Sequence, residues 1–155
     1  MPVMFYHLTH SKQEDTVFTL LSRALGAGWR VMVRGSNPEG LDHLDRALWT
    51  ASDDSFLPHG REGGAHDALQ PVLLGTGKGT NNANCLMVVD GAAFDPAEAG
   101  ALDRLWVLFD GMDDAALAHA RDQWRAVVGA GVAAQYWSEE GGRWEKKAER
   151  GTASA

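Results

Sequence analysis

Residues 3–34, VMFYHLTHSKQEDTVFTLLSRALGAGWRVMVR, decide the fold of this chain. Val3–Leu8 is a short apolar run that predicts a buried strand. Ser11 and Glu14 have the S-x-x-E spacing of a capping box, which predicts a helix with Ser11 as its N-cap. Apolar residues then recur at helical spacing until two glycines end the pattern, and Trp29–Arg34 predicts a second strand.

The same alternation continues along the chain. Leucines at 41, 44 and 48 form a second helical stripe with Trp49, and another helix is predicted over 113–128. Further strands are predicted at the apolar runs Val72–Leu74, Leu86–Val89 and Leu105–Phe109. The segment 132–148 fits either an edge strand with a turn or a short helix. We therefore expect a three-layer α/β fold, in which helices flank a mostly parallel sheet.

Length, charge and cysteine content restrict the class of protein. The 155 residues suggest one domain, and an apolar content of 45% indicates a globular chain. The net charge is −7, of which residues 1–120 carry −8 and residues 121–155 carry +1. An acidic chain argues against strong direct binding to nucleic acid. Cys85 is the one cysteine, which excludes an internal disulfide and a cysteine-based zinc site.

The chain ends predict neither targeting nor membrane insertion. The first residues lack the basic start and long apolar run of a signal peptide. No segment approaches the roughly 20 apolar residues that a membrane helix needs. We therefore expect a cytoplasmic protein without membrane contact. Residues 1–148 are predicted to form the domain, and 149–155, ERGTASA, a flexible C-terminal tail.

Gly75–Thr80, GTGKGT, is the stretch that suggests a phosphate site. A P-loop needs a glycine five positions before the glycine of its Gly-Lys pair, and that position is Val72. The spacing also fails the dinucleotide fingerprint, and the junction after the first strand has no glycine. A flexible turn is the favoured interpretation, and a small α/β nucleotide-binding protein or enzyme that uses this turn is the alternative.

The histidines do not have the spacing of a zinc enzyme. No pair has H-x-x-x-H spacing on a helix, and no G-x-S-x-G motif marks a nucleophilic serine. His59, His66 and Asp67 share the long irregular segment 52–70, where a loop metal site is an open alternative. The sequence therefore predicts no catalytic residues, no cofactor and no metal site.

The predicted helix at 113–128 carries the candidate for a binding site. Arg121, Trp124 and Arg125 fall at i, i+3 and i+4, so they share one helix face. An arginine fork can hold a carboxylate through two parallel hydrogen bonds, and an indole supplies apolar surface beside it. This face predicts a receptor for a carboxylate next to an apolar side chain. The same pattern is also typical of arginine stems that lie over a half-buried aromatic ring.

Several segments, in order along nearly the whole chain, resemble the chi subunit of bacterial DNA polymerase III holoenzyme. They are FYHL at 5–8, LDHLDRALWTASDDSFLPHG at 41–60, QPVLL at 70–74, LFDG at 108–111, ARDQWRAVVGAG at 120–131, and YW with RWEKKA between 136 and 148. The most specific block is an LD..LW……SF.PH pattern that contains Leu48, Trp49, Ser55, Phe56, Pro58 and His59. The resemblance implies a single Rossmann-like α/β domain without a nucleotide site.

The resemblance also implies a function in DNA replication. Chi subunits are non-catalytic members of the clamp-loader assembly, and they bind the acidic C-terminal tail of single-stranded DNA-binding protein. That tail ends in Pro-Phe with a free carboxylate. The resemblance implies that Arg121 and Arg125 hold carboxylates while Trp124 helps to form the phenylalanine pocket. We expect Trp137 and Trp144 to close over this site.

A second partner is implied by the same resemblance: the psi subunit or another clamp-loader subunit. The family's surface for psi is hydrophobic and centres on the loop after the LW helix. Carried over to this chain, the candidates are Trp49, Phe56 and Leu57, although Trp49 on a helical stripe is also typical of a core residue. The chain is then expected in the cytoplasm, in the replisome at the nucleoid, without catalytic activity of its own.

Overall fold

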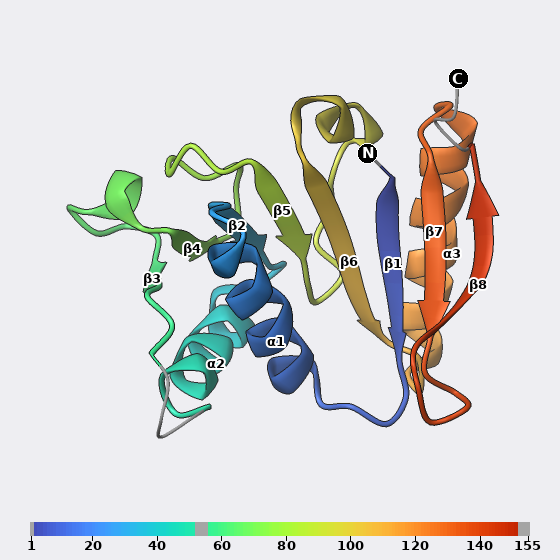
Figure 1. The fold of residues 1–155 in the computed structure, drawn as a ribbon, viewed down its shortest axis with the longest axis horizontal. Helices are drawn as coiled ribbons and strands as arrows, with labels where there is room; N and C mark the ends of the chain where they lie inside the picture. Colours follow the sequence, from blue (N-terminus) through green and yellow to red (C-terminus); the bar gives the residue numbers. More distant parts are fainter. Residues whose placement is uncertain (1, 52–55, 152–155) are drawn as a thin grey trace.

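The computed structural model describes residues 2–51 and 56–151, which form one eight-stranded sheet with helices on both faces (Figure 1). The strands are β1 (Val3–Leu8), β2 (Val31–Arg34), β3 (Gly60–Arg61), β4 (Val72–Gly75), β5 (Cys85–Val88), β6 (Arg104–Asp110), β7 (Ala134–Ser138) and β8 (Glu145–Arg150). Their order across the sheet is β3-β4-β2-β5-β6-β1-β7-β8, and only β8 is antiparallel to its neighbour.

Helices α1 (Gln13–Gly26) and α2 (Pro38–Trp49) cover one face of the sheet, and α3 (Asp114–Gly129) covers the other (Figure 1). Two short 3₁₀ helices, η1 (Asp67–Leu69) and η2 (Pro96–Ala101), lie in the connections. The predicted three-layer α/β fold with a mostly parallel sheet is thereby confirmed. Within the described ranges, no helix combines the length and the apolar character needed to cross a bilayer.

The central strands are apolar because both of their faces are buried. In β2, Val31 and Val33 pack with α1 and α2, whereas Met32 packs in the core on the opposite face. In β1, Val3 and Phe5 face the core beneath α3, and Tyr6 lies on the α1 face. Parallel strands that are covered on both sides are typically continuous apolar runs, which is why the sequence pattern located them.

The predicted capping box at the start of α1 is wrong. Lys12, not Ser11, is the N-cap residue, and its side chain makes no capping hydrogen bond. The Ser11 hydroxyl instead donates to the Glu139 carboxylate at 2.7 Å. The same carboxylate accepts from the backbone N–H groups of Thr9 and His10, so it fixes the β1–α1 junction against the end of β7.

The C-terminal region forms two antiparallel strands, β7 and β8, which settles the alternatives left open for 132–148. Glu149 and Arg150, the first two residues of the predicted tail, belong to β8. Residues 152–155 of that predicted tail lie outside the described residues. Of the segment 52–70, residues 56–70 contain β3 and η1, while 52–55, including Ser55 of the family block, also lie outside the described residues.

Candidate functional site

Helix α3 presents the predicted tail-binding residues. Its start is fixed by Asp113, whose carboxylate accepts hydrogen bonds from the backbone N–H groups of Ala115 and Ala116. Ala120 and Val127 are buried against the sheet, which orients the rest of the helix. Arg121 and Arg125 are consequently exposed, with Trp124 half-buried between them in sequence.

Trp124 packs edge-on against two aromatic rings of the sheet. Its ring centroid lies 5.5 Å from that of Phe5 at 69° and 5.9 Å from that of Tyr136 at 83°. These are T-shaped contacts, which favour aromatic pairs beyond the apolar area that they bury. Trp124 is therefore packed against the sheet, and its spacing places it on the helix face of Arg121 and Arg125.

The Tyr136 hydroxyl extends this cluster into polar contacts, since it lies 2.7 Å from His7 Nδ1. Burial raises the pKa of the Tyr136 phenol, the Arg121 guanidinium partly offsets that effect, and Glu140 adds to it. The Arg121 guanidinium is thus close enough to the Tyr136 hydroxyl to affect its pKa.

Arg125 forms an exposed ion pair with Asp122 at 3.1 Å. Such a surface pair is weak, so a carboxylate from a partner can replace Asp122.

The expectation that Trp137 and Trp144 close over this site is wrong. Tyr136 and Trp137 are consecutive in β7, so their side chains point to opposite faces of the sheet. Tyr136 contacts Trp124 beneath α3, whereas Trp137 and Trp144 line a groove of about 380 Å³ with Tyr6 and residues of α1. The three predicted residues on α3 line neither this groove nor the crevice described below.

The structure brings two of the three predicted partner-surface residues together. The rings of Trp49 and Phe56 lie 5.5 Å apart, and the two residues are 49% and 71% exposed. Large exposed aromatic side chains of this kind mark protein–protein contact sites. Leu57, by contrast, is 4% exposed and packs in the core with α1 and α2, so it is not part of the exposed surface.

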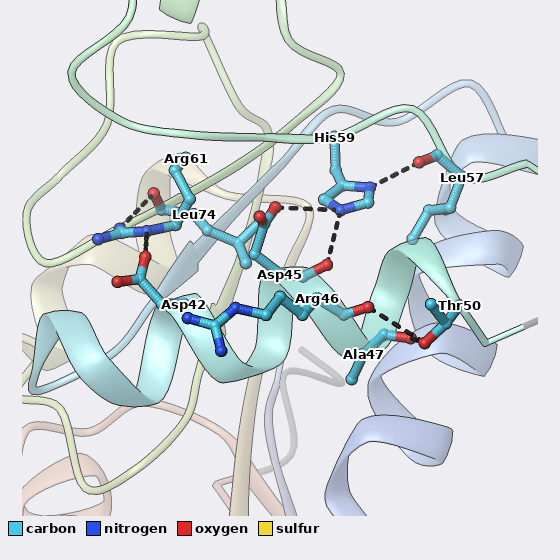
Figure 2. Close-up of polar contacts among 9 residues, drawn as sticks. All are labelled: Asp42, Asp45, Arg46, Ala47, Thr50, Leu57, His59, Arg61 and Leu74. Atoms are coloured by element: carbon cyan, nitrogen blue, oxygen red, sulfur yellow. Dashed lines mark hydrogen bonds and ion pairs between the residues drawn. The ribbon is translucent and has the colours of Figure 1, made fainter.

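Beneath Trp49 lies His59, the last residue of the family block and a candidate metal ligand in the sequence. Figure 2 shows its imidazole between Asp45 of α2 and the backbone carbonyl of Leu57. The ring centroids of His59 and Trp49 are 4.2 Å apart. On the next turn of α2, Asp42 pairs with Arg61 of β3 at 2.8 Å. The Thr50 hydroxyl donates to the carbonyls of Arg46 and Ala47 and closes the helix beside Trp49.

Two residues of the possible loop metal site, His59 and Asp67, are engaged elsewhere. The Asp67 carboxylate accepts hydrogen bonds from the backbone N–H groups of Gly63 and Gly64, while His59 is buried against α2. Over residues 2–51 and 56–151, no three histidine, cysteine, aspartate or glutamate side chains are grouped as metal ligands.

A crevice of about 820 Å³ opens at the carboxyl ends of β1 and β6. The helices that follow these adjacent strands lie on opposite faces of the sheet, which is where α/β proteins usually bind ligands. Here the lining includes the carboxylates of Asp90, Asp110 and Asp113, and their negative charge disfavours a phosphate group.

The Gly75–Thr80 turn does not line that crevice. Arg34, which is 6% exposed, donates to the carbonyls of Gly77 and Ala93 and pairs with both oxygens of Glu98. These hydrogen bonds from Arg34 hold the pKa of Glu98 below its ordinary value. The turn is therefore anchored to a structural ion pair, which favours the interpretation as a turn over a phosphate loop.

Comparison with known proteins agrees with the sequence pattern. A family model described as "DNA polymerase III chi subunit, HolC" matches residues 1–135, a range that contains both the α3 face and the Trp49–Phe56 surface. A search of curated proteins found no match.

Proposed function

The chain belongs to the DNA polymerase III chi subunit family, whose members are accessory subunits of the polymerase, and we propose that it acts as a non-catalytic replication adaptor. In this role it links the clamp loader to single-stranded DNA-binding protein by binding the acidic C-terminal tail of that protein. The observation that carries the proposal is the α3 face, on which two exposed arginines adjoin a half-buried tryptophan.

The chemistry of the α3 face suits such a tail. Arg121 and Arg125 are one helical turn apart, so their guanidiniums can hold carboxylates of one short peptide. Trp124, braced by Phe5 and Tyr136, offers apolar surface for a terminal phenylalanine ring. Half-buried Val128 lies one turn further along the same face and extends this apolar surface. On a chain of net charge −7, this exposed arginine pair gives an acidic peptide a local point of attraction.

We assign the second partner contact to Trp49 and Phe56. A partner that buries these two rings gains apolar contact area at the exposed end of α2, about 25 cal/mol for each Å² buried. The psi subunit is the proposed partner, with another clamp-loader subunit as the alternative. Leu57 is buried in the core and is therefore left out of this contact.

Titration calorimetry with a peptide that copies the tail tests the first contact. Wild type should bind the peptide saturably, more weakly at high salt, and much more weakly when the terminal phenylalanine is removed. Arg125→Glu should abolish binding while the domain stays folded, because Arg125 is exposed and makes only a surface ion pair.

Arg143→Glu is the matched control, since it makes the same charge change on an exposed arginine before β8. It should leave peptide binding close to that of wild type. Equal loss in both variants would show that only the overall charge matters, and retained affinity in Arg125→Glu would remove Arg125 from the site.

The alternative, a small nucleotide-binding protein or enzyme, has less support. Arg34 holds the Gly75–Thr80 turn, and carboxylates line the large crevice. A thermal-shift panel of nucleotides tests it, because a ligand at 100 times its Kd should add about 2.7 kcal/mol to the free energy of unfolding.

A further inference from the structure

His59 is a buried titratable residue to which the proposed function gives no role. Its side chain is 0% exposed, although it lies directly beneath the half-exposed Trp49. It ends the segment 56–59 and precedes β3, so it stands where that segment crosses the last turns of α2 (Figure 2).

Among the described residues, each ring nitrogen of His59 faces hydrogen-bond acceptors. Nδ1 lies 2.6 Å from the Leu57 carbonyl oxygen. Nε2 lies 3.2 Å from the Asp45 carboxylate oxygen Oδ1 and 3.3 Å from the Asp45 carbonyl oxygen. Carbonyl and carboxylate oxygens accept but do not donate, so both nitrogens must carry a proton to satisfy these contacts. The hydrogen-bond geometry therefore assigns His59 as an imidazolium, with Asp45 as its counter-ion.

Asp45 is the carboxylate that pairs with His59, because Asp42 on the same helix is paired with Arg61. Of the charged side chains drawn in Figure 2, Asp42, Asp45 and Arg46 belong to α2 and Arg61 to β3, and Asp45 is the one whose contact with His59 is drawn. Asp42 is engaged by Arg61 at 2.8 Å, and the Arg61 guanidinium also donates to the Leu74 carbonyl. Asp45, whose side chain is 24% exposed, makes its ion pair with His59. A buried cation is tolerated only with such a partner.

The imidazolium also connects the two exposed rings. Its centroid is 4.2 Å from that of Trp49, close enough for attraction between the cation and the indole face. Its Nδ1 proton holds the Leu57 carbonyl, and Leu57 is the residue next to Phe56. The Nε2 proton is donated to the Asp45 carbonyl oxygen in α2, the helix that ends at Trp49. One side chain thus fixes both halves of the Trp49–Phe56 surface.

We propose that His59, as an imidazolium paired with Asp45, is a positioning residue that holds Trp49 and Phe56 together as the partner-binding surface, so that partner binding requires the protonated ring. A neutral ring leaves one nitrogen facing oxygen acceptors without a hydrogen to share, so the hydrogen bond to Leu57 or the one to Asp45 is lost. The part of this inference that concerns binding rests on the proposed function, whereas the state of the ring does not.

Long-range ¹H–¹⁵N NMR of the full chain tests the state of the ring directly. At about pH 6, wild type should show protons on both His59 nitrogens. Asp45→Asn removes the counter-ion and should lose one of the two N–H signals at about pH 6. Asp42→Asn, which removes a carboxylate from the same helix without touching His59, should keep both.

Psi binding by a His59 variant tests the consequence. His59→Phe keeps a ring beneath Trp49 but has no N–H to donate, so it should bind psi at least about tenfold more weakly than wild type while the domain stays folded. A single N–H on His59 in wild type, or wild-type affinity in His59→Phe, overturns the inference. If wild type itself fails to bind psi, the proposed partner and the binding claim are wrong, while the NMR result still reports the state of the ring.

Discussion

Glu139→Gln should loosen the junction between β1 and α1 from the end of β7. Glu139 is 4% exposed, and its Oε1 accepts hydrogen bonds from the backbone N–H groups of Thr9, His10 and Ser11 at 2.9, 2.8 and 2.7 Å. Its Oε2 accepts from the Ser11 hydroxyl at 2.7 Å. The substitution keeps the shape of the side chain and removes its charge.

The expected cost follows from these bonds. A hydrogen bond to a charged group contributes about 1.5–3 kcal/mol, and a neutral one about 0.5–1.5 kcal/mol. The glutamine oxygen can still accept from the three N–H groups, so each bond weakens by about 1 kcal/mol. Because the three bonds share one acceptor, their losses are not additive. We expect the free energy of unfolding to fall by about 2–3 kcal/mol at neutral pH.

The pH dependence of this loss has a definite sign. Burial alone would raise the pKa of Glu139, but the hydrogen bonds from Ser11, Thr9 and His10 outweigh burial and lower it from the ordinary value of 4.5. A carboxyl group with a lowered folded-state pKa contributes stability that is present above its unfolded pKa. That contribution is lost as the pH falls through the folded pKa, so wild type and variant should converge in acid.

Urea denaturation at neutral and acid pH measures both effects. Glu140→Gln is the control, because the neighbouring side chain is 63% exposed and lies 3.9 Å from His7 Nε2. The reasoning is refuted if Glu139→Gln costs no more than the control at neutral pH, or if its cost is the same at both pH values.

Three other predictions test the core and the surface. Burial raises the pKa of the Cys85 thiol to about 11, so mass spectrometry should find labelling by a thiol reagent at about pH 8 only after unfolding, and rapid labelling of the folded chain would contradict this. In urea denaturation, Phe56→Ala should change the free energy of unfolding by less than about 0.5 kcal/mol, whereas Leu57→Ala should lower it by about 2–5 kcal/mol; equal costs would contradict their assigned places. Arg34→Leu leaves Glu98 without its bidentate partner and should cost about 3–5 kcal/mol in thermal denaturation, and a double change that also makes Glu98→Leu should recover part of it.

The central strands were predictable because both of their faces are buried, which makes them continuous apolar runs. β8 was not predictable in this way, since Glu145–Arg150 is EKKAER and carries no apolar pattern. It is a strand because it pairs with β7, a tertiary contact that the sequence does not display. Charged side chains on such an outer strand also discourage pairing with another chain.

The errors at the candidate sites have the same origin. Ser11 and Glu14 have the local spacing of a capping box, but Ser11 bonds to Glu139, which is 128 residues away in sequence. The opposite orientation of Tyr136 and Trp137 follows only once β7 is known to be a strand. The spacing of Arg121, Trp124 and Arg125, by contrast, lies within one helix and needed no distant contact to be recognised.

Chemical-shift mapping of the tail peptide on the ¹⁵N-labelled full chain tests the central claim most directly. The account predicts that the largest shifts fall on the α3 backbone around Arg121 and Arg125 and on the Trp124 indole N–H. Shifts concentrated in the groove of Trp137 and Trp144, on the opposite face of the sheet, would place the peptide elsewhere and contradict the assignment. No shifts at millimolar peptide would contradict the adaptor role itself.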